Sequence, residues 1–299
     1  MHLSRIFNEY GLFQHMNGWN RKYVEESNTN QYLIKEFLFR ASSAYLSINR
    51  MNMLSINCVN EYRRQKSRLK LNNNRILFWT PTVIEILSEM SPFLSTLRIL
   101  QNNIFRLAAN EYNPHAHVPK SLNDAIKKGL DTYGLSDMLC EHFLSYWIEN
   151  GEKLKNYRDM DQHYYAMIRR SYIQTSPEEK LLIFLPDNPE EKSTRSVTFR
   201  KELDAITYLN EAFFKFHDFA EETGKLFGFE AENINTIDVE GEFNVPKENG
   251  NSTLALVILD KVTGRSYEAW LERRDEKTFL GNIHHGPISL RPPNTPLEK

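Results

Sequence analysis

A short segment, residues 158–163, brings an arginine, two aspartates and a histidine close together in the chain. On a helix, which turns by about 100° per residue, Arg158 lies about 100° and His163 about 240° from Tyr157. Tyr157 belongs to the apolar stripe expected to face the core, which consists of Leu154, Tyr157, Tyr164 and Ile168. Arg158 and His163 therefore point away from the helix's own core, where another molecule can meet them.

Asp159 adds a carboxylate to this pair. It precedes His163 by four residues, the spacing at which a carboxylate on a helix can hold an imidazole in a chosen orientation. Histidine suits proton transfer near neutral pH because its unperturbed pKa is about 6.5. Arginine is always protonated, and its forked guanidinium binds phosphate through two hydrogen bonds. The three side chains together are candidates for a functional site, and the alternative is a solvated helix face whose charges keep the protein in solution.

At these residues the chain resembles the HEPN superfamily, the "higher eukaryotes and prokaryotes nucleotide-binding" helical domains. The family signature is an arginine followed by a polar residue, with a histidine four to six residues further on. Arg158, Asp159 and His163 match it with four intervening residues. Tyr165 falls where toxin members of the family carry a tyrosine two residues after the histidine. The similarity covers residues from about 31 to 230.

The resemblance implies metal-independent cleavage of RNA, with no cofactor. Arg158 would stabilise the charge on the phosphorus centre, His163 would transfer protons, and Asp159 would orient the imidazole. Because one helix supplies one histidine, the resemblance also implies a homodimer that places two such motifs around one cleft. Tyr165 has two interpretations: an aromatic residue at the rim of the interface, which we favour, or a regulatory site for a nucleotidyltransferase or antitoxin partner.

Four basic residues flank the motif and are the candidates for steering RNA towards it. They are Lys153, Lys155, Arg169 and Arg170. A second basic cluster, within residues 63–70, ends a predicted helix, and its favourable interaction with the helix dipole explains it adequately. The pairs His115/His117 and His284/His285 lack a well-spaced further ligand, so no metal site is predicted.

The composition restricts the class of protein. The chain has 299 residues and a formal net charge of −2, so it has no overall attraction for nucleic acid and any contact with RNA depends on a local patch. Two cysteines far apart indicate no disulfide framework or zinc site. We expect a cytoplasmic protein, because the start carries no signal-like apolar run and charges interrupt every long hydrophobic stretch. Glycine-rich phosphate loops, nucleophile elbows and zincin motifs are not found in the sequence.

The predicted fold is mainly α: a HEPN-like antiparallel helical bundle with a small C-terminal β region. Residues 1–30 are expected to pack on the bundle, residues 31–230 to form it, and residues 231–299 to be β-rich with a mobile tail. The bundle helices are predicted at 31–70, 81–112, 121–133, 136–172 and 199–227, with one strand at 181–185. Further strands are predicted at 253–259, 265–271 and 278–283.

Three functions remain open from the sequence. The first is an endoribonuclease of the toxin or phage-defence kind. The second is a catalytically inactive HEPN-like module for dimerisation or for binding RNA or nucleotides. The third is an unrelated helical interaction protein.

Overall fold

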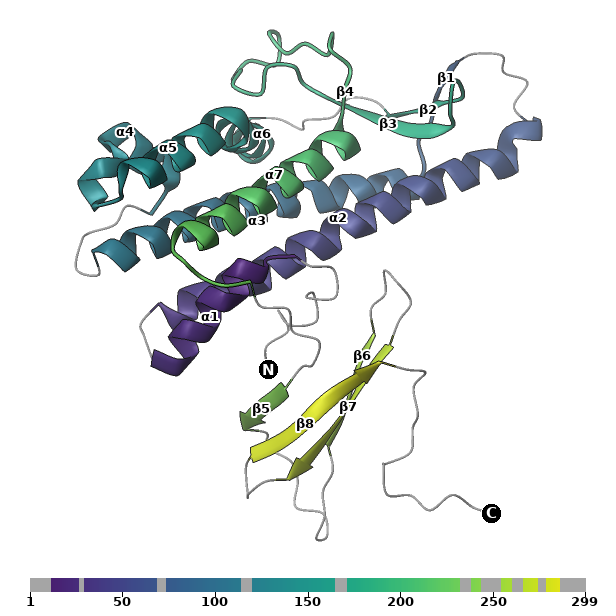
Figure 1. The fold of residues 1–299 in the computed structure, drawn as a ribbon. Helices are drawn as coiled ribbons and strands as arrows, with labels where there is room; N and C mark the ends of the chain where they lie inside the picture. Colours follow the sequence, from purple (N-terminus) through teal and green to yellow (C-terminus); the bar gives the residue numbers. More distant parts are fainter. Residues whose placement is uncertain are drawn as a thin grey trace, which may run out of the picture. The chain divides into compact units, whose positions relative to one another are not determined.

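The computed structural model describes residues 12–26, 30–68, 74–113, 120–164 and 171–231, together with four strands further along the chain. The described residues belong to two compact units. Phe13–Ala231 forms a helical unit, and the four later strands belong to a second unit (Figure 1). The predicted mobile tail from residue 292 and the N-terminal segment up to residue 11 lie outside the described residues.

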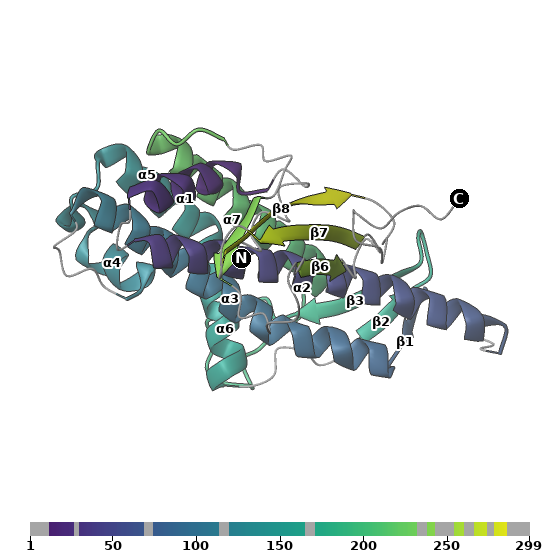
Figure 2. The same ribbon diagram turned by 90° about the horizontal axis from the view of Figure 1, so that it is seen from below.

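Two long helices form the base of the helical unit. They are α2 (Gln31–Gln65) and α3 (Pro81–Tyr112), which lie side by side in Figures 1 and 2. Thr80 is extended and Pro81 opens α3, as predicted, because proline lacks the N–H group that the first turn leaves unpaired anyway. The two helices pack through buried apolar faces that include Phe37 and Ile48 on α2 and Leu97 on α3. The predicted helix 31–70 is confirmed as far as Gln65, where a short 3₁₀ turn, Lys66–Arg68, follows; the last two predicted residues lie outside the described residues.

The remaining helices cover this pair. They are α1 (Gln14–Glu26), α4 (Leu122–Lys128), α5 (Asp137–Tyr146), α6 (Glu152–His163) and α7 (Ala205–Leu226). Side-chain caps begin three of them: Ser121 accepts from the backbone N–H of Asp124, Ser136 from that of Leu139, and Asp204 from that of Thr207. Such caps satisfy N–H groups that the first helical turn leaves unpaired. The predicted starts at Ser121 and Ser136 are therefore confirmed.

The motif lies on α6, which follows α5 through a π-helical turn, Trp147–Gly151. Helix α6 leaves the direction of α5, so that Figure 1 shows it nearly end-on, and it packs against α3. The prediction that this helix continues to residue 172 is wrong. Helix α6 ends at His163, and the chain forms strand β2 (Ser171–Gln174) instead, because these residues find hydrogen-bonding partners in strands distant in sequence.

A small antiparallel sheet lies at the end of the α2–α3 pair (Figure 1). Its strands, in sheet order, are β1 (Arg75–Leu77), β2, β3 (Lys180–Leu185) and β4 (Leu203–Asp204). Only β3 was predicted, as an apolar run; its residues Leu181, Ile183 and Leu185 are buried. The register pairs Ser171 with Ile183 and Ile76 with Ile173. The start of α7 also moves from the predicted residue 199 to Ala205, because β4 precedes it.

The second unit contains a four-stranded antiparallel sheet. Its strands are β5 (Asp238–Glu242), β6 (Leu254–Leu259), β7 (Ser266–Arg273) and β8 (Thr278–His285), in the order β5-β8-β7-β6. The predicted hairpin and the predicted third strand are confirmed as β6, β7 and β8, whereas β5 was not predicted. The fold is thus mainly α with a small antiparallel β region at the C-terminal end, as the sequence predicts. Within the described residues, no helix is both long enough and apolar enough to cross a bilayer.

Candidate functional site

Helix α6 is fastened to the bundle by one apolar stripe. Leu154, Tyr157 and Met160 are fully buried, and the hydroxyl group of Tyr157 donates to the carbonyl oxygen of Pro186 at 2.6 Å. The prediction that Tyr164 belongs to this stripe is wrong: 44% of Tyr164 is exposed. Its backbone has already left the helical conformation, and Met160, one turn earlier, fills the core position instead.

Arg158 and Asp159 are joined to one another. The Nη1 atom of Arg158 donates to Oδ1 of Asp159 at 2.8 Å, and Nζ of Lys155 lies 2.8 Å from the other carboxylate oxygen. Partial burial alone would raise the pKa of Asp159, but hydrogen bonds from Lys155 and Arg158, with their charges, outweigh it and lower that pKa. Asp159 therefore fixes a pair of cations on the exposed side of α6.

His163 ends α6 and is exposed. Within the described residues it forms no hydrogen bond with Asp159, and the ring of Tyr164 lies 6.3 Å from its own, centroid to centroid. The expected orientation of His163 by Asp159 is therefore not found. The carboxylate instead meets Lys155, four residues before it on the helix, and Arg158, its direct neighbour. Both contacts are charge-assisted hydrogen bonds, which are the stronger kind.

A single chain does not bring Arg158 and His163 onto one face. Five residues along a helix correspond to a rise of about 7.5 Å and a rotation of about 140°. Arg158 is half-buried, and its Nε atom is buried without a hydrogen-bond partner. The motif in one chain is thus a fixed cation and, further along the helix, an exposed imidazole.

A buried polar network that the sequence did not predict lies beneath the motif. Arg98 on α3 is only 8% exposed, lies 5.3 Å from the ring centroid of Trp147, and donates to Gln101. Gln101 donates to the Tyr146 hydroxyl at 2.7 Å, and Asn150 donates to the same hydroxyl and to the backbone of α7. Burial lowers the pKa of Arg98; the Asp159 carboxylate opposes this shift and the Arg158 guanidinium adds to it. The network links α3, the π turn and α7.

The sequence of α3 contained one sign of this network: polar residues on its otherwise apolar face. Arg98 and Gln101 interrupt the apolar stripe of α3 at a spacing of three residues, on the face that also carries Leu94 and Leu97. Polar groups on a buried face require partners. A third polar residue of α3, Ser95, accepts a hydrogen bond from Gln162 at 2.6 Å, which holds the last turn of the motif helix.

Of the four residues predicted to steer RNA, the structure describes two, Lys153 and Lys155, and their contacts differ. Lys155 is held by Asp159, whereas the ammonium of Lys153 lies 4.8 Å from the ring centroid of Tyr208 and 5.8 Å from that of Tyr157. The other residues with a predicted role, Tyr165, Arg169 and Arg170, lie outside the described residues, as do Ile168 of the stripe and the His115/His117 pair. His284 and His285 lie in β8.

The basic cluster at the end of α2 has a partner that the sequence did not indicate. Glu179 accepts from Nε of Arg63 at 2.7 Å and from Nζ of Lys66 at 2.6 Å. These ion pairs tie the helix end to the segment before β3, so a structural role explains this part of the cluster. Across the described ranges, no group of three or more histidine, cysteine, aspartate or glutamate residues is arranged to hold a metal ion.

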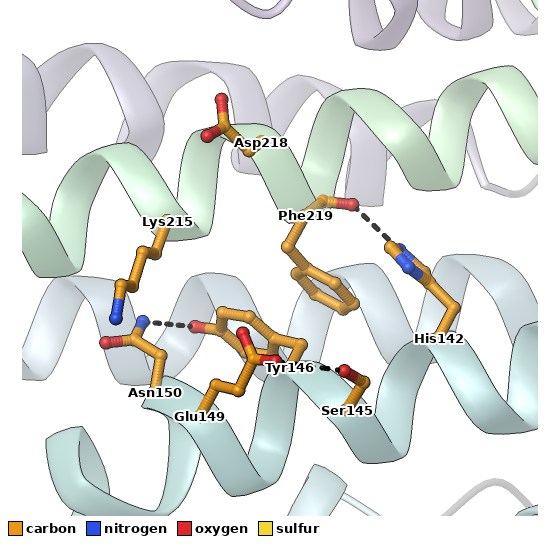
Figure 3. Close-up of a pocket in the computed structure, with 8 residues that line it drawn as sticks. All are labelled: His142, Ser145, Tyr146, Glu149, Asn150, Lys215, Asp218 and Phe219. Atoms are coloured by element: carbon orange, nitrogen blue, oxygen red, sulfur yellow. Dashed lines mark hydrogen bonds between the residues drawn. The ribbon is translucent and has the colours of Figure 1, made fainter.

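A pocket of about 270 Å³ lies between α5, the π turn and α7. Figure 3 shows it, with Tyr146 and Phe219 in its wall. Their rings stack with centroids 4.0 Å apart. His142 is held at one end, where Nε2 contacts the carbonyl oxygen of Phe219 at 3.1 Å. Lys215 and Asp218 of α7 line the opposite side.

No family model, curated protein or solved structure gives a significant match to this chain. The resemblance to HEPN domains therefore depends on Arg158, Asp159 and His163 in their positions on α6.

Proposed function

We propose that the chain is a metal-independent endoribonuclease of the toxin or phage-defence kind, which acts as a homodimer. The observation that supports this best is the exposure of His163 at the end of α6, beyond Arg158, whose guanidinium is fixed on Asp159. A histidine that is neither buried nor hydrogen-bonded within the described chain contributes little to folding. Its imidazole is accessible for proton transfer.

The proposed reaction is attack of an RNA 2′-hydroxyl on the adjacent phosphorus. The 2′-oxygen forms a bond to phosphorus while its proton passes to one imidazole, and the bond from phosphorus to the 5′-oxygen breaks as that oxygen takes a proton from the other. The products are a 2′,3′-cyclic phosphate and a free 5′-hydroxyl. Arg158 stabilises the negative charge on the non-bridging oxygens.

The two imidazoles come from two chains. The motif contains one histidine, so a single motif lacks the second proton-transfer group that the reaction uses. An isologous contact between two copies of α6 supplies His163 of the partner subunit. The role of Asp159 changes accordingly: it is a positioning residue for Arg158 rather than for His163.

The first experiment measures cleavage of a labelled RNA in EDTA by wild-type protein and by His163→Ala. We expect the wild type to cut without added metal and to leave a 2′,3′-cyclic phosphate, and His163→Ala to lose cleavage by about 100-fold or more. Arg158→Ala should show a comparable loss. Lys127→Ala, which removes an exposed cation from the distant helix α4, is the matched control and should retain activity. Cleavage that requires Mg²⁺ or Mn²⁺, or that survives His163→Ala, contradicts the proposal.

The second candidate is a catalytically inactive module that dimerises or binds RNA or nucleotides. One observation favours it: the guanidinium of Arg158 is already bound by Asp159, and Asp159 leaves His163 without a carboxylate partner. Such a module would retain RNA on a filter without cutting it. Binding should weaken in Arg158→Ala and with rising salt, as phosphate contacts do.

A further inference from the structure

The pocket in Figure 3 is lined by one lysine, Lys215, and Lys153 follows Asn150, another lining residue, by three positions in the chain. Lys153 is on α6, Lys201 precedes β4, and Lys215 is on α7 and lines the pocket itself. Within the described residues, none of the three forms an ion pair or a side-chain hydrogen bond. By contrast, Lys66 and Lys155 are both paired with carboxylates. Glu211 and Asp187 act on the charges of Lys153 and Lys201 without pairing directly with their ammonium groups, so the ammonium groups can still form hydrogen bonds to a ligand.

The positions of Lys153 and Lys215 bring their charges onto one side of the α6–α7 contact. Lys153 lies over the ring of Tyr208, and Lys215 follows Tyr208 by seven residues, two helical turns along the same face of α7. Partial burial lowers the pKa of Lys153, and the ammonium groups of Lys201 and Lys215 lower it further; Glu211 opposes them. This shift is what mutual repulsion between neighbouring cations produces.

The pocket itself is lined mainly by aromatic rings, an amide and two carboxylates. Its wall contains the stacked rings of Tyr146 and Phe219, and its other lining groups include the amide of Asn150. Two carboxylates lie at its edge. Glu149 accepts from Ser145 at 3.4 Å, and Asp218 is 3.0 Å from Nδ1 of His217. They oppose a second anionic group inside the pocket, so a ligand with one anionic end and an uncharged body fits best.

We propose that this surface binds a small organic phosphate, with the phosphate between Lys153 and Lys215 and the uncharged body in the pocket beside Tyr146. The volume of about 270 Å³ is below the range of roughly 300–1,000 Å³ that drug-sized ligands occupy, so the body is the size of a single sugar or ring. The site is separate from Arg158 and His163, and the inference does not depend on the proposed cleavage of RNA.

The test uses the full chain and isothermal titration with AMP and with ribose 5-phosphate, which share a phosphate and differ in the ring. Adenosine, which lacks the phosphate, is the third probe. We expect at least one of the two phosphates to bind and adenosine not to bind. Affinity should fall with added salt, since the contact is between charges. Failure of both phosphates to bind, or equal binding of adenosine, overturns the proposal.

Variants locate the site. Lys215→Gln and Lys153→Gln should each weaken phosphate binding by about tenfold, because each removes one charge while keeping most of the side-chain length. Lys225→Gln is the matched control: Lys225 is on the same helix, pairs with Glu222 and does not line the pocket, so affinity should be unchanged. Equal affinity in all three variants overturns the proposed location.

A pocket-filling variant separates the pocket from the lysines. Ser145→Phe places a ring at an exposed position of the pocket wall and should weaken binding of the phosphate with the larger body, while the unfolding midpoint stays near that of the wild type. Unchanged affinity contradicts the pocket half of the proposal. If a single-stranded RNA binds through Lys153 and Lys215 whereas neither small phosphate does, the surface is an RNA contact and the proposal is wrong.

Discussion

At the scale of single residues, two buried tyrosines beside the motif differ in how their hydroxyl groups are satisfied. Tyr157 donates to the carbonyl oxygen of Pro186, while the buried hydroxyl of Tyr208 has no hydrogen-bond partner among the described residues. Their ring centroids lie 5.0 Å apart, and both side chains are buried. Burial raises the pKa of both hydroxyls, so both stay protonated across the physiological range. Comparing the removal of each hydroxyl therefore measures how much the hydrogen bond from Tyr157 to Pro186 contributes to the free energy of unfolding.

We predict that Tyr157→Phe lowers the free energy of unfolding by about 1–3 kcal/mol, because it leaves the Pro186 carbonyl without its donor in a buried place. Tyr208→Phe removes a hydroxyl that has no partner, so it should be neutral or stabilising. Denaturant unfolding of the two variants beside wild type measures both effects. Equal destabilisation by the two changes would show that the Tyr157 bond contributes nothing specific.

At the scale of elements, the π turn between α5 and α6 decides where the motif points. It changes the direction of the chain and buries Trp147 and Asn150 together. Gly151 makes this packing fit: a Cβ atom there would lie 2.9 Å from Cε3 of Trp147 and 3.2 Å from Cε1 of Tyr146. π turns within α-helices are rare and frequent at functional sites.

We predict that Gly151→Ala destabilises the protein by about 1–3 kcal/mol, although alanine is by itself the better helix former. The ring of Trp147 is buried and packs against the Arg98 guanidinium, so moving it away from a Cβ at position 151 would disturb that contact. Glu152→Ala, at the next and exposed position, is the control and should change stability little. Thermal unfolding of the two variants measures the difference, and a Gly151→Ala protein as stable as wild type would mean that the turn adapts.

At the scale of the whole molecule, the helical unit contains a histidine whose folded surroundings favour the neutral imidazole. His142 on α5 is half-buried and contacts the carbonyl oxygen of Phe219 and the hydroxyl of Thr223, both on α7. Burial lowers its pKa below 6.5, and the hydrogen bond to Phe219 only partly offsets this. The unfolded chain therefore binds a proton more readily than the folded chain as the pH falls below 6.5.

We predict that the contribution of His142 to stability is fully present above pH 6.5 and is lost as the pH falls through the folded-state pKa. His142→Gln keeps an amide donor near Phe219 without the titration, so its unfolding free energy should fall less than that of wild type between pH 7 and pH 5. Leu144→Gln, an exposed position on the same helix, should retain the full pH dependence. The same loss in all three proteins would exclude His142 as the cause.

Local sequence determined the helices and their starts. Proline at position 81 and the serines at 121 and 136 satisfy or remove N–H groups of their own first turns, and apolar residues at helical spacing specify which face is buried. The same reasoning located Arg158 and His163 outside the core stripe. It predicted the mainly α fold, the strand β3 and three strands near the C-terminal end.

Tertiary contacts decided the rest. Helix α6 stops at His163 and the chain enters strand β2 at Ser171 because β1 and β3 provide backbone partners for β2. Strand β1 lies nearly a hundred residues earlier in the chain, and Ile183 of β3, the partner of Ser171, lies twelve residues later. Asp159 binds Lys155 and Arg158 rather than His163 because the free energy of competing contacts, not helical spacing, selects its partner. Arg98 and the pocket at Lys215 depend on helices that meet only in the folded unit. Periodicity within one segment carries no information about such partners.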